Sequence, residues 1–193
     1  MRKTKNILLV GVGGQGIILA SKILSQGLID AGFDVKMSEV HGMAQRGGSV
    51  TTQVRFGDDV HSPIIGKGQA DIIVAFEKME AYRWLNYLKP DGIAVVNDYA
   101  IPSAPTLSGK VPYPETILED IAEVVKNLTV VKAADIAVEL GNIKAQNIVL
   151  LGALLKAMRI DDINWEEVLT DNVKEKFIPL NKKALSEGMQ QVK

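Results

Sequence analysis

The sequence of 193 residues contains no cysteine and only two histidines, and these absences exclude whole classes of chemistry. Without thiols the chain can form no disulfide, can use no thiolate nucleophile and can supply no cysteine ligand to an iron–sulfur cluster. Because His41 and His61 are the only imidazoles, a multi-histidine metal site is also not expected, and we predict no metal site in this chain. The sequence therefore indicates that the protein is poorly equipped to carry out a redox reaction alone.

An excess of one charge and long apolar runs are absent as well. The 22 Lys and Arg residues nearly balance the 23 Asp and Glu residues, so nothing favours electrostatic binding to nucleic acid or to an anionic membrane. Apolar runs such as 148–151 are far too short to span a bilayer, and the first residues lack the cleavage site of a signal peptide. We therefore expect a cytoplasmic protein with one domain over residues 1–193 and no nucleic-acid or membrane partner.

The hydrophobic pattern predicts alternating strands and helices. A strand at 6–10, a helix at 14–30 and a strand at 33–40 form a βαβ unit, which indicates a parallel sheet with a right-handed crossover. Further strands are expected at 49–56, 71–75, 93–96 and 128–131, and further helices at 78–88, 115–126, 133–140, 145–158, 165–176 and 181–190. The predicted fold is a three-layer α/β domain with a mostly parallel, Rossmann-like sheet, an inserted hairpin and a helical C-terminal part.

The inserted hairpin is expected between residues 49 and 65. Apolar and polar residues alternate over 49–56, a turn signal follows at 57–59, and residues 60–65 can return as a short strand. The alternation places Gln53 and Arg55 on a polar face, which predicts a sheet that is wet on one side or covered by a partner.

The glycine-rich motif Gly11-Val-Gly-Gly-Gln-Gly16 lies between the first strand and the first helix, which is the context of a dinucleotide-binding turn. The helix N-terminus offers N–H groups to an anion, and Glu39 lies about where a ribose-binding acid would. One interpretation is therefore a free-standing dinucleotide-binding protein, such as a small dehydrogenase. The other is that the glycines only let a strand turn into a closely packed helix, and we favour it because Gly14-Gln15 departs from the usual pattern.

The residues from Glu39 to Gly48 (Glu-Val-His-Gly-Met-Ala-Gln-Arg-Gly-Gly) form a polar loop that combines an acid, an imidazole, an amide and a guanidinium. Arg46 can bind a carboxylate or phosphate bidentately, or pair with Glu39 in the same chain. His41 can transfer protons near neutral pH, or simply hydrogen-bond the backbone of its own loop. The candidate catalytic residues are His41 and Arg46, and the candidate residues for cofactor binding or partner contact are Gly11, Gly13, Gly14, Gln15, Gly16, Glu39, Gln45, Arg46, Gly47 and Gly48.

Other conspicuous side chains have structural interpretations. Glu77 and Glu80 lie where a helix begins, and acids there suit the helix dipole. Trp84 and Trp165 are expected to pack helices onto the core, and His61 is expected in a surface turn.

Together, the glycine turn and the loop resemble those of the gamma-type subunit family of the 2-oxoacid:ferredoxin oxidoreductases. Two further segments support the resemblance, Asp71-Ile-Ile-Val-Ala-Phe-Glu77 and Asn147-Ile-Val-Leu-Leu-Gly-Ala153, and it extends from residue 6 to about residue 158. It implies a subunit of an enzyme that oxidatively decarboxylates aryl-pyruvates such as indolepyruvate to acyl-CoA and passes electrons to ferredoxin. It also implies that thiamine diphosphate, magnesium and iron–sulfur clusters reside on a larger, cysteine-rich partner subunit. Coenzyme A would be the co-substrate, and this chain alone would bind no cofactor and be inactive.

Overall fold

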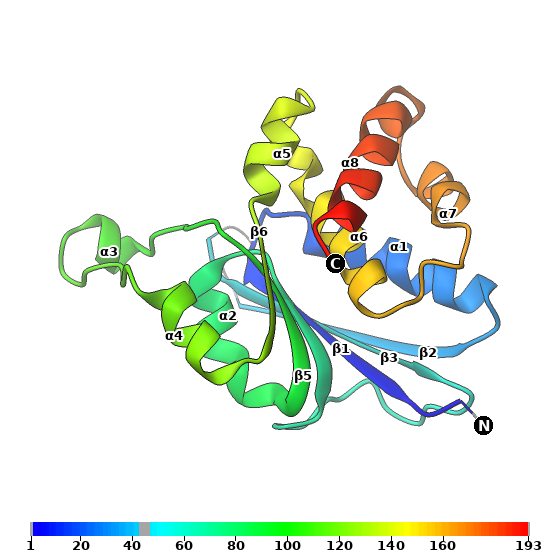
Figure 1. Ribbon diagram of the computed structural model, residues 1–193, viewed down its shortest axis with the longest axis horizontal. Helices are drawn as coiled ribbons and strands as arrows, with labels where there is room; N and C mark the ends of the chain where they lie inside the picture. Colours follow the sequence, from blue (N-terminus) through cyan, green and yellow to red (C-terminus); the bar gives the residue numbers. More distant parts are fainter. Residues whose placement is uncertain (1, 43–46, 193) are drawn as a thin grey trace.

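The computed structural model describes residues 2–42 and 47–192 and shows a six-stranded sheet between helices (Figure 1). The strands follow the order β2-β3-β1-β4-β5-β6 across the sheet. Their bounds are β1 (Lys5–Val12), β2 (Asp34–His41), β3 (Ser49–Gly57), β4 (Ala70–Ala75), β5 (Leu88–Asn97) and β6 (Asn127–Val131). From β1 to β6 the neighbours are parallel, whereas β3 runs antiparallel to both β1 and β2. The predicted Rossmann-like α/β fold is confirmed.

Helices cover both faces of the sheet (Figure 1). On one face lie α1 (Ile17–Asp30), α5 (Ala133–Glu139), α6 (Gln146–Ala157), α7 (Trp165–Asn172) and α8 (Ile178–Gln190). On the other face lie α2 (Lys78–Trp84) and α4 (Ile117–Val124), while the single turn α3 (Ala104–Leu107) projects from the body. Short 3-10 turns occupy Leu85–Tyr87, Ile143–Ala145 and Glu175–Phe177. Within the described ranges, no helix has both the length and the apolar character needed to cross a membrane.

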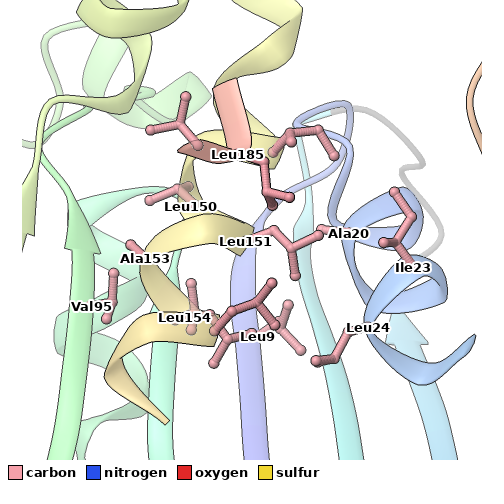
Figure 2. Close-up of a cluster of buried hydrophobic side chains, with 14 of the residues drawn as sticks. Leu9, Ala20, Ile23, Leu24, Val95, Leu150, Leu151, Ala153, Leu154 and Leu185 are labelled. Carbon is pink, nitrogen blue, oxygen red and sulfur yellow. The ribbon is translucent and has the colours of Figure 1, made fainter. Parts of the chain in front are cut away.

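The central strand β1 is buried on both faces, as a continuous apolar run in a parallel sheet requires. Ile7 and Leu9 belong to the core beneath α1 and α6, whereas Leu8 and Val10 belong to the core beneath α2 and α4. Figure 2 shows the larger core, in which α6 contributes Leu150, Leu151 and Leu154, with Val95 of the sheet on one side of α6 and Leu9, Ala20 and Leu24 on the other. Because successive side chains of β1 point to opposite faces of the sheet, this one strand contributes to both cores.

Glycines let helices approach unusually closely in this core. A Cβ placed on Gly27 of α1 would lie 2.2 Å from the ring of Trp165, which confirms the predicted packing role of that tryptophan. A Cβ placed on Gly152 of α6 would lie 2.2 Å from the carbonyl oxygen of Leu185 in α8. The backbones of α6 and α8 therefore come into direct contact at Gly152, beside the buried side chain of Leu185.

The predicted hairpin of residues 49–65 is wrong in its second arm. Residues 60–65 form no strand, and β3 pairs with β2 instead. Arg55 donates to the carbonyl oxygens of Ser62 at 2.8 Å and Ile64 at 3.3 Å. Gln53 accepts the N–H of Ile65 at 2.6 Å. The segment 58–69 thus covers the polar face of β3, because side chains of that face satisfy its backbone in place of a strand ladder.

The start of one strand and the neighbours of β1 also differ from the prediction. The strand expected at 93–96 begins at Leu88, so the expected turn at 89–92 lies inside β5. β1 and β2 run in the same direction, as a βαβ unit requires, but they are not neighbours because β3 lies between them. Because β3 is inserted there, it is β3 and not β2 that lies beside β1 and the glycine turn.

Candidate functional site at the carboxyl edge of the sheet

The glycine turn lies where the strand order of the sheet reverses. The chain leaves β1 through α1 on one face and leaves β4 through α2 on the other. In open α/β sheets, ligands bind outside the carboxyl ends of the strands at such a point. Gly14 and Gly16 have φ values of 105° and 80°, in the left-handed region that glycine adopts without strain. The topology therefore places residues 11–16 where a ligand site is expected.

Gln15 closes the crevice from inside. Its side chain is buried, its Oε1 accepts the N–H of Val12 at 2.8 Å, and its Nε2 donates to the carbonyl oxygen of Phe76 at 2.7 Å. A Cβ on Gly11 would lie 2.8 Å from that Oε1 and 2.8 Å from the Cβ of Phe76. Position 11 therefore has no room for a side chain, because the Gln15 amide that bridges the ends of β1 and β4 lies against it.

Further buried amides extend this bridge. Asn97 at the end of β5 donates to the same Phe76 carbonyl at 3.1 Å and to Oε1 of Gln146 at 3.3 Å. Asn147 donates to the carbonyl oxygen of Gly16 at 3.1 Å, and a Cβ on Gly16 would lie 2.6 Å from that amide nitrogen. Asn97 and Gln146 belong to none of the sequence motifs, because they are 49 positions apart and only the fold brings them together.

The structure brings the glycine turn and the end of the polar loop together. Gly13 donates to the carbonyl oxygen of Gly48 at 2.9 Å, and Gly47 donates to the carbonyl oxygen of Gly13 at 3.3 Å. The proposed site residues Gln45 and Arg46 lie outside the described residues, and so does any pairing of Arg46 with Glu39. Two backbone hydrogen bonds therefore set the end of the loop directly on the turn.

His41 and the glycine turn share a cavity of about 420 Å³, which is also lined by Ile18 and Val50. The His41 ring is exposed, and its Nδ1 lies 3.3 Å from the carbonyl oxygen of Gly42, in the local contact that the sequence suggested. A second cavity of about 620 Å³ lies on the other side of the turn and includes Tyr99 and Ile101. Residues 13–16 line both cavities.

Glu39 does not adjoin the turn in the manner of a ribose-binding acid. It pairs with Thr52 of β3, and Thr52 in turn pairs with Leu9 of β1. Two strand spacings, roughly 9–10 Å, therefore separate the backbone of Glu39 from β1. The inserted strand occupies the neighbouring position that the second parallel strand holds in a dinucleotide-binding unit.

The first turn of α2 carries two buried carboxylates that bind two distant segments. Glu77 caps the helix by accepting the N–H of Glu80 at 2.9 Å, as expected of an acid at a helix start. Its other oxygen accepts the N–H of Ile101 at 3.2 Å and the hydroxyl of Tyr113 at 2.5 Å. Glu80 accepts the hydroxyl of Ser49, the residue that follows the polar loop, at 2.5 Å. These anchoring contacts go beyond the sequence interpretation of the two acids.

The hydroxyl of Tyr113 is held in its neutral form. Burial, followed by the hydrogen bond to Glu77 and the charge of that carboxylate, raises the pKa of Tyr113 well above its usual range.

Within residues 2–42 and 47–192, no group of three or more His, Cys, Asp or Glu side chains is arranged to hold a metal ion.

Over residues 6–191 the sequence matches the family described as pyruvate ferredoxin/flavodoxin oxidoreductase. The chain belongs to this family. Among its relatives in the pyruvate ferredoxin/flavodoxin oxidoreductase family, the indolepyruvate oxidoreductase subunit IorB of Pyrococcus horikoshii is 38% identical, over 99% of this chain and 97% of the relative. The common subunit gamma of the pyruvate/ketoisovalerate oxidoreductases of Pyrococcus furiosus is 30% identical, over 92% of this chain and 91% of the relative. The resemblance that the motifs indicated is confirmed.

Solved structures of similar chains confirm the fold of this family member. The gamma subunit of the keto/oxoacid ferredoxin oxidoreductase of Geobacter sulfurreducens superimposes with a TM-score of 0.72 at 24% identity, over 98% of this chain and 96% of that chain. The 2-oxoglutarate:ferredoxin oxidoreductase of Magnetococcus marinus gives a TM-score of 0.76 at 22% identity, over 99% of this chain and 31% of that chain.

Proposed function

We propose that the chain is the cofactor-free subunit of a 2-oxoacid:ferredoxin oxidoreductase that acts on indolepyruvate or another aryl-pyruvate. The complex decarboxylates its substrate oxidatively to the acyl-CoA thioester and passes the electrons to ferredoxin. The observation that carries this proposal is the 38% identity to an indolepyruvate oxidoreductase subunit over 99% of the chain. The pyruvate/ketoisovalerate relatives support the same reaction type at 30% identity.

In this proposal a larger, cysteine-rich subunit holds thiamine diphosphate, magnesium and the iron–sulfur clusters, and coenzyme A is the co-substrate. The absence of cysteine from all 193 residues supports this division, because cluster ligation depends on thiolates that this chain does not have. We place the complex in the cytoplasm.

The polar loop and the glycine turn form the contact with that larger subunit, close to its cofactor. Two backbone hydrogen bonds of Gly13 fix the end of the loop on the turn, and His41 is exposed beside it. Arg46 is the residue we assign to bind a carboxylate or phosphate of the substrate or a partner acid, and His41 is a candidate for proton transfer.

A dinucleotide-binding protein is the alternative function, and the geometry of the turn argues against it. Gln15 fills the crevice between the ends of β1 and β4 with its own amide, and β3 separates Glu39 from β1. If calorimetry on the purified chain gave micromolar affinity for NAD(P), and Gly13→Val abolished it, this alternative would replace the proposal.

The main test compares the chain alone with the assembled complex. We expect no reduction of ferredoxin or of a viologen dye by the isolated chain with indolepyruvate and coenzyme A, and activity once the larger subunit is added. An isolated chain that reduces the dye at the rate of the complex would contradict the proposed function.

Arg46→Ala tests the role of the loop. Loss of one charge-assisted contact in the transition state costs about 1.5–3 kcal/mol, so we expect roughly ten- to a hundred-fold slower turnover of the complex. The melting temperature of the isolated subunit should not change. Lys22→Ala, on the exposed surface of α1, is the matched control. Arg55 is unsuitable as a control because its guanidinium holds the backbone of Ser62 and Ile64.

A further inference from the structure

One buried carboxylate closes the base of a projecting arm, which we define as residues 102–112. Glu77 is 1% exposed, and a single one of its oxygens accepts the N–H of Ile101 and the hydroxyl of Tyr113. These two donors are the residues that flank the arm on either side. The arm therefore leaves the body and returns to it at one fixed point.

The arm is ordered by contacts within itself and stands apart from the body (Figure 1). Leu107 donates its N–H to the carbonyl oxygen of Ser103 at 2.9 Å, and Lys110 donates its N–H to that of Pro105 at 3.0 Å. The hydroxyl of Ser108 also donates to the Pro105 carbonyl, at 2.9 Å. Pro102, Pro105 and Pro112 restrict φ along the arm. Its shape therefore does not depend on packing against the rest of the chain.

The arm exposes apolar side chains and almost no charge. Leu107 is 75% exposed, the highest value for a large apolar residue in the described ranges, and Val111 is 53% exposed. Lys110 is the only charged residue between positions 99 and 114. On a pre-formed projection that carries a single charge, these exposed apolar side chains suit an apolar contact in an assembly.

The base of the arm is continuous with the site at the carboxyl edge of the sheet. Tyr99 and Ile101 line the same cavity as the glycine turn. Through the first turn of α2, Glu77 is also joined to Glu80, which holds Ser49 at the end of the polar loop. The arm and the loop therefore extend from one edge and share one anchor.

We propose that the arm is a second docking element for the larger, thiamine-diphosphate-binding subunit, inserting Leu107 and Val111 into an apolar pocket of that subunit. Glu77 and Tyr113 are positioning residues that hold the arm in its docking orientation. The inference rests on the proposed function, since it takes the same partner for the arm as for the loop. A pre-organised arm loses little conformational entropy on binding, which favours affinity.

Trypsin provides a direct test, because Lys110 is the only lysine or arginine between Lys89 and Lys126. We expect cleavage at Lys110 in the isolated chain to become at least tenfold slower in the complex with the larger subunit. Lys67, exposed in the loop before β4 at the opposite edge of the sheet, serves as the internal reference and should be cleaved at an unchanged rate. Equal cleavage at Lys110 in the isolated chain and in an intact, active complex would overturn the inference while leaving the proposed function in place.

Substitutions of the two exposed apolar residues of the arm give the second test. The double variant Leu107→Glu, Val111→Glu should weaken assembly with the larger subunit at least tenfold in Kd, without changing the melting temperature of the isolated chain. Val124→Glu introduces the same charge at an apolar residue of α4 that is 68% exposed and should leave Kd unchanged. Unchanged Kd for the double variant would also overturn the inference.

Tyr113→Phe tests the clamp, because it removes one anchoring hydrogen bond and keeps the ring. We expect faster cleavage at Lys110 in the isolated chain and a severalfold weaker Kd for the larger subunit. Glu77→Gln keeps one oxygen for the N–H of Ile101 and the hydroxyl of Tyr113 and gives up the cap on the N–H of Glu80, so it should lower the melting temperature and still retain most of the affinity. If Tyr113→Phe changes neither cleavage nor Kd, the clamp does not position the arm. If no complex with a thiamine-diphosphate subunit forms even with the wild-type chain, the proposed function itself fails.

Discussion

Gly188 of α8 lies against the backbone of Val149 in α6, so that a Cβ on Gly188 would come within 1.9 Å of the Val149 carbonyl oxygen. Gly188→Ala should therefore destabilise the fold, by about 3 kcal/mol, because a backbone oxygen cannot move aside as a flexible side chain can. Urea unfolding measures the change. Ser186→Ala, on the exposed side of the same helix, should be nearly neutral, and an equally stable Gly188→Ala protein would show that the helices separate freely.

Gln15→Met should destabilise the chain by about 1–3 kcal/mol, because the buried N–H of Val12 loses its acceptor while side-chain volume is nearly conserved. Chemical denaturation is the measurement. Gln26→Met on the exposed surface of α1 should change stability by less than about 0.5 kcal/mol. Equal effects at the two positions would mean that the Gln15 bridge contributes nothing specific to the turn.

Arg159→Gly should stabilise the protein. Arg159 ends α6 with a φ of 54°, and Ile160 closes the helix by donating to the carbonyl oxygen of Leu155. Glycine adopts this conformation without the steric cost of a Cβ, which outweighs its greater freedom in the unfolded chain by about 0.5–1 kcal/mol. Gly141→Ala, at φ 99° after α5, should move the melting temperature in the opposite direction. A lower melting temperature for Arg159→Gly would contradict the argument.

Thr52→Val should also stabilise the chain, by about 1 kcal/mol. The hydroxyl of Thr52 is fully buried in β3 and has no hydrogen-bond partner within the described part of the chain. Valine keeps the branched shape and removes the desolvated oxygen. Thr52→Ser keeps the hydroxyl and loses the methyl group, so it should lower the unfolding midpoint. The same midpoint for valine and threonine would indicate that the hydroxyl is satisfied by water.

The clamp at Tyr113 should give the stability a pH dependence at high pH. The pKa of Tyr113 is raised in the folded chain, mainly by burial, so the neutral hydroxyl favours the folded state. This contribution is fully present below the unfolded pKa of about 10 and is lost as pH rises above it. The stability of the wild-type chain should therefore fall more between pH 9 and 11 than that of Tyr113→Phe, as thermal unfolding would show. If the stabilities of the wild-type chain and of Tyr113→Phe changed equally with pH, this role of the Tyr113 hydroxyl would be contradicted.

The elements of the fold could largely be predicted from the sequence, whereas their neighbours could not. Apolar runs such as 7–10 and 72–75 predict buried strands because a strand covered on both faces has no polar side. The alternating pattern of β3 shows which of its side chains share a face of the sheet. It does not show which strands lie beside β3, so its position between β1 and β2 could not be predicted. The same pattern therefore predicted a return strand at 60–65, where side chains of β3 bind the backbone instead.

The candidate site was predictable where its residues are close in sequence. The glycine turn and the polar loop were found as motifs, and Gly13 and Gly48 do meet. Residues that act across the fold, such as Asn97 with Gln146 and Glu77 with Tyr113, carry no local signal because distant strands and helices bring them together. Gln15 departs from a dinucleotide-binding motif, and the structure explains this residue by its hydrogen bond to the carbonyl oxygen of Phe76, which is distant in sequence.

The order of the elements along the chain has a consequence for synthesis on the ribosome. All six strands precede residue 132, whereas α6 and α8, which cover one face of the sheet, follow residue 145. Ile7, Leu9 and Val95 on that face therefore emerge long before α6, which completes their burial. A nascent chain halted near residue 140 would hold a sheet whose apolar face is covered by α1 but not by α6 and α8, the kind of species that chaperones protect from aggregation.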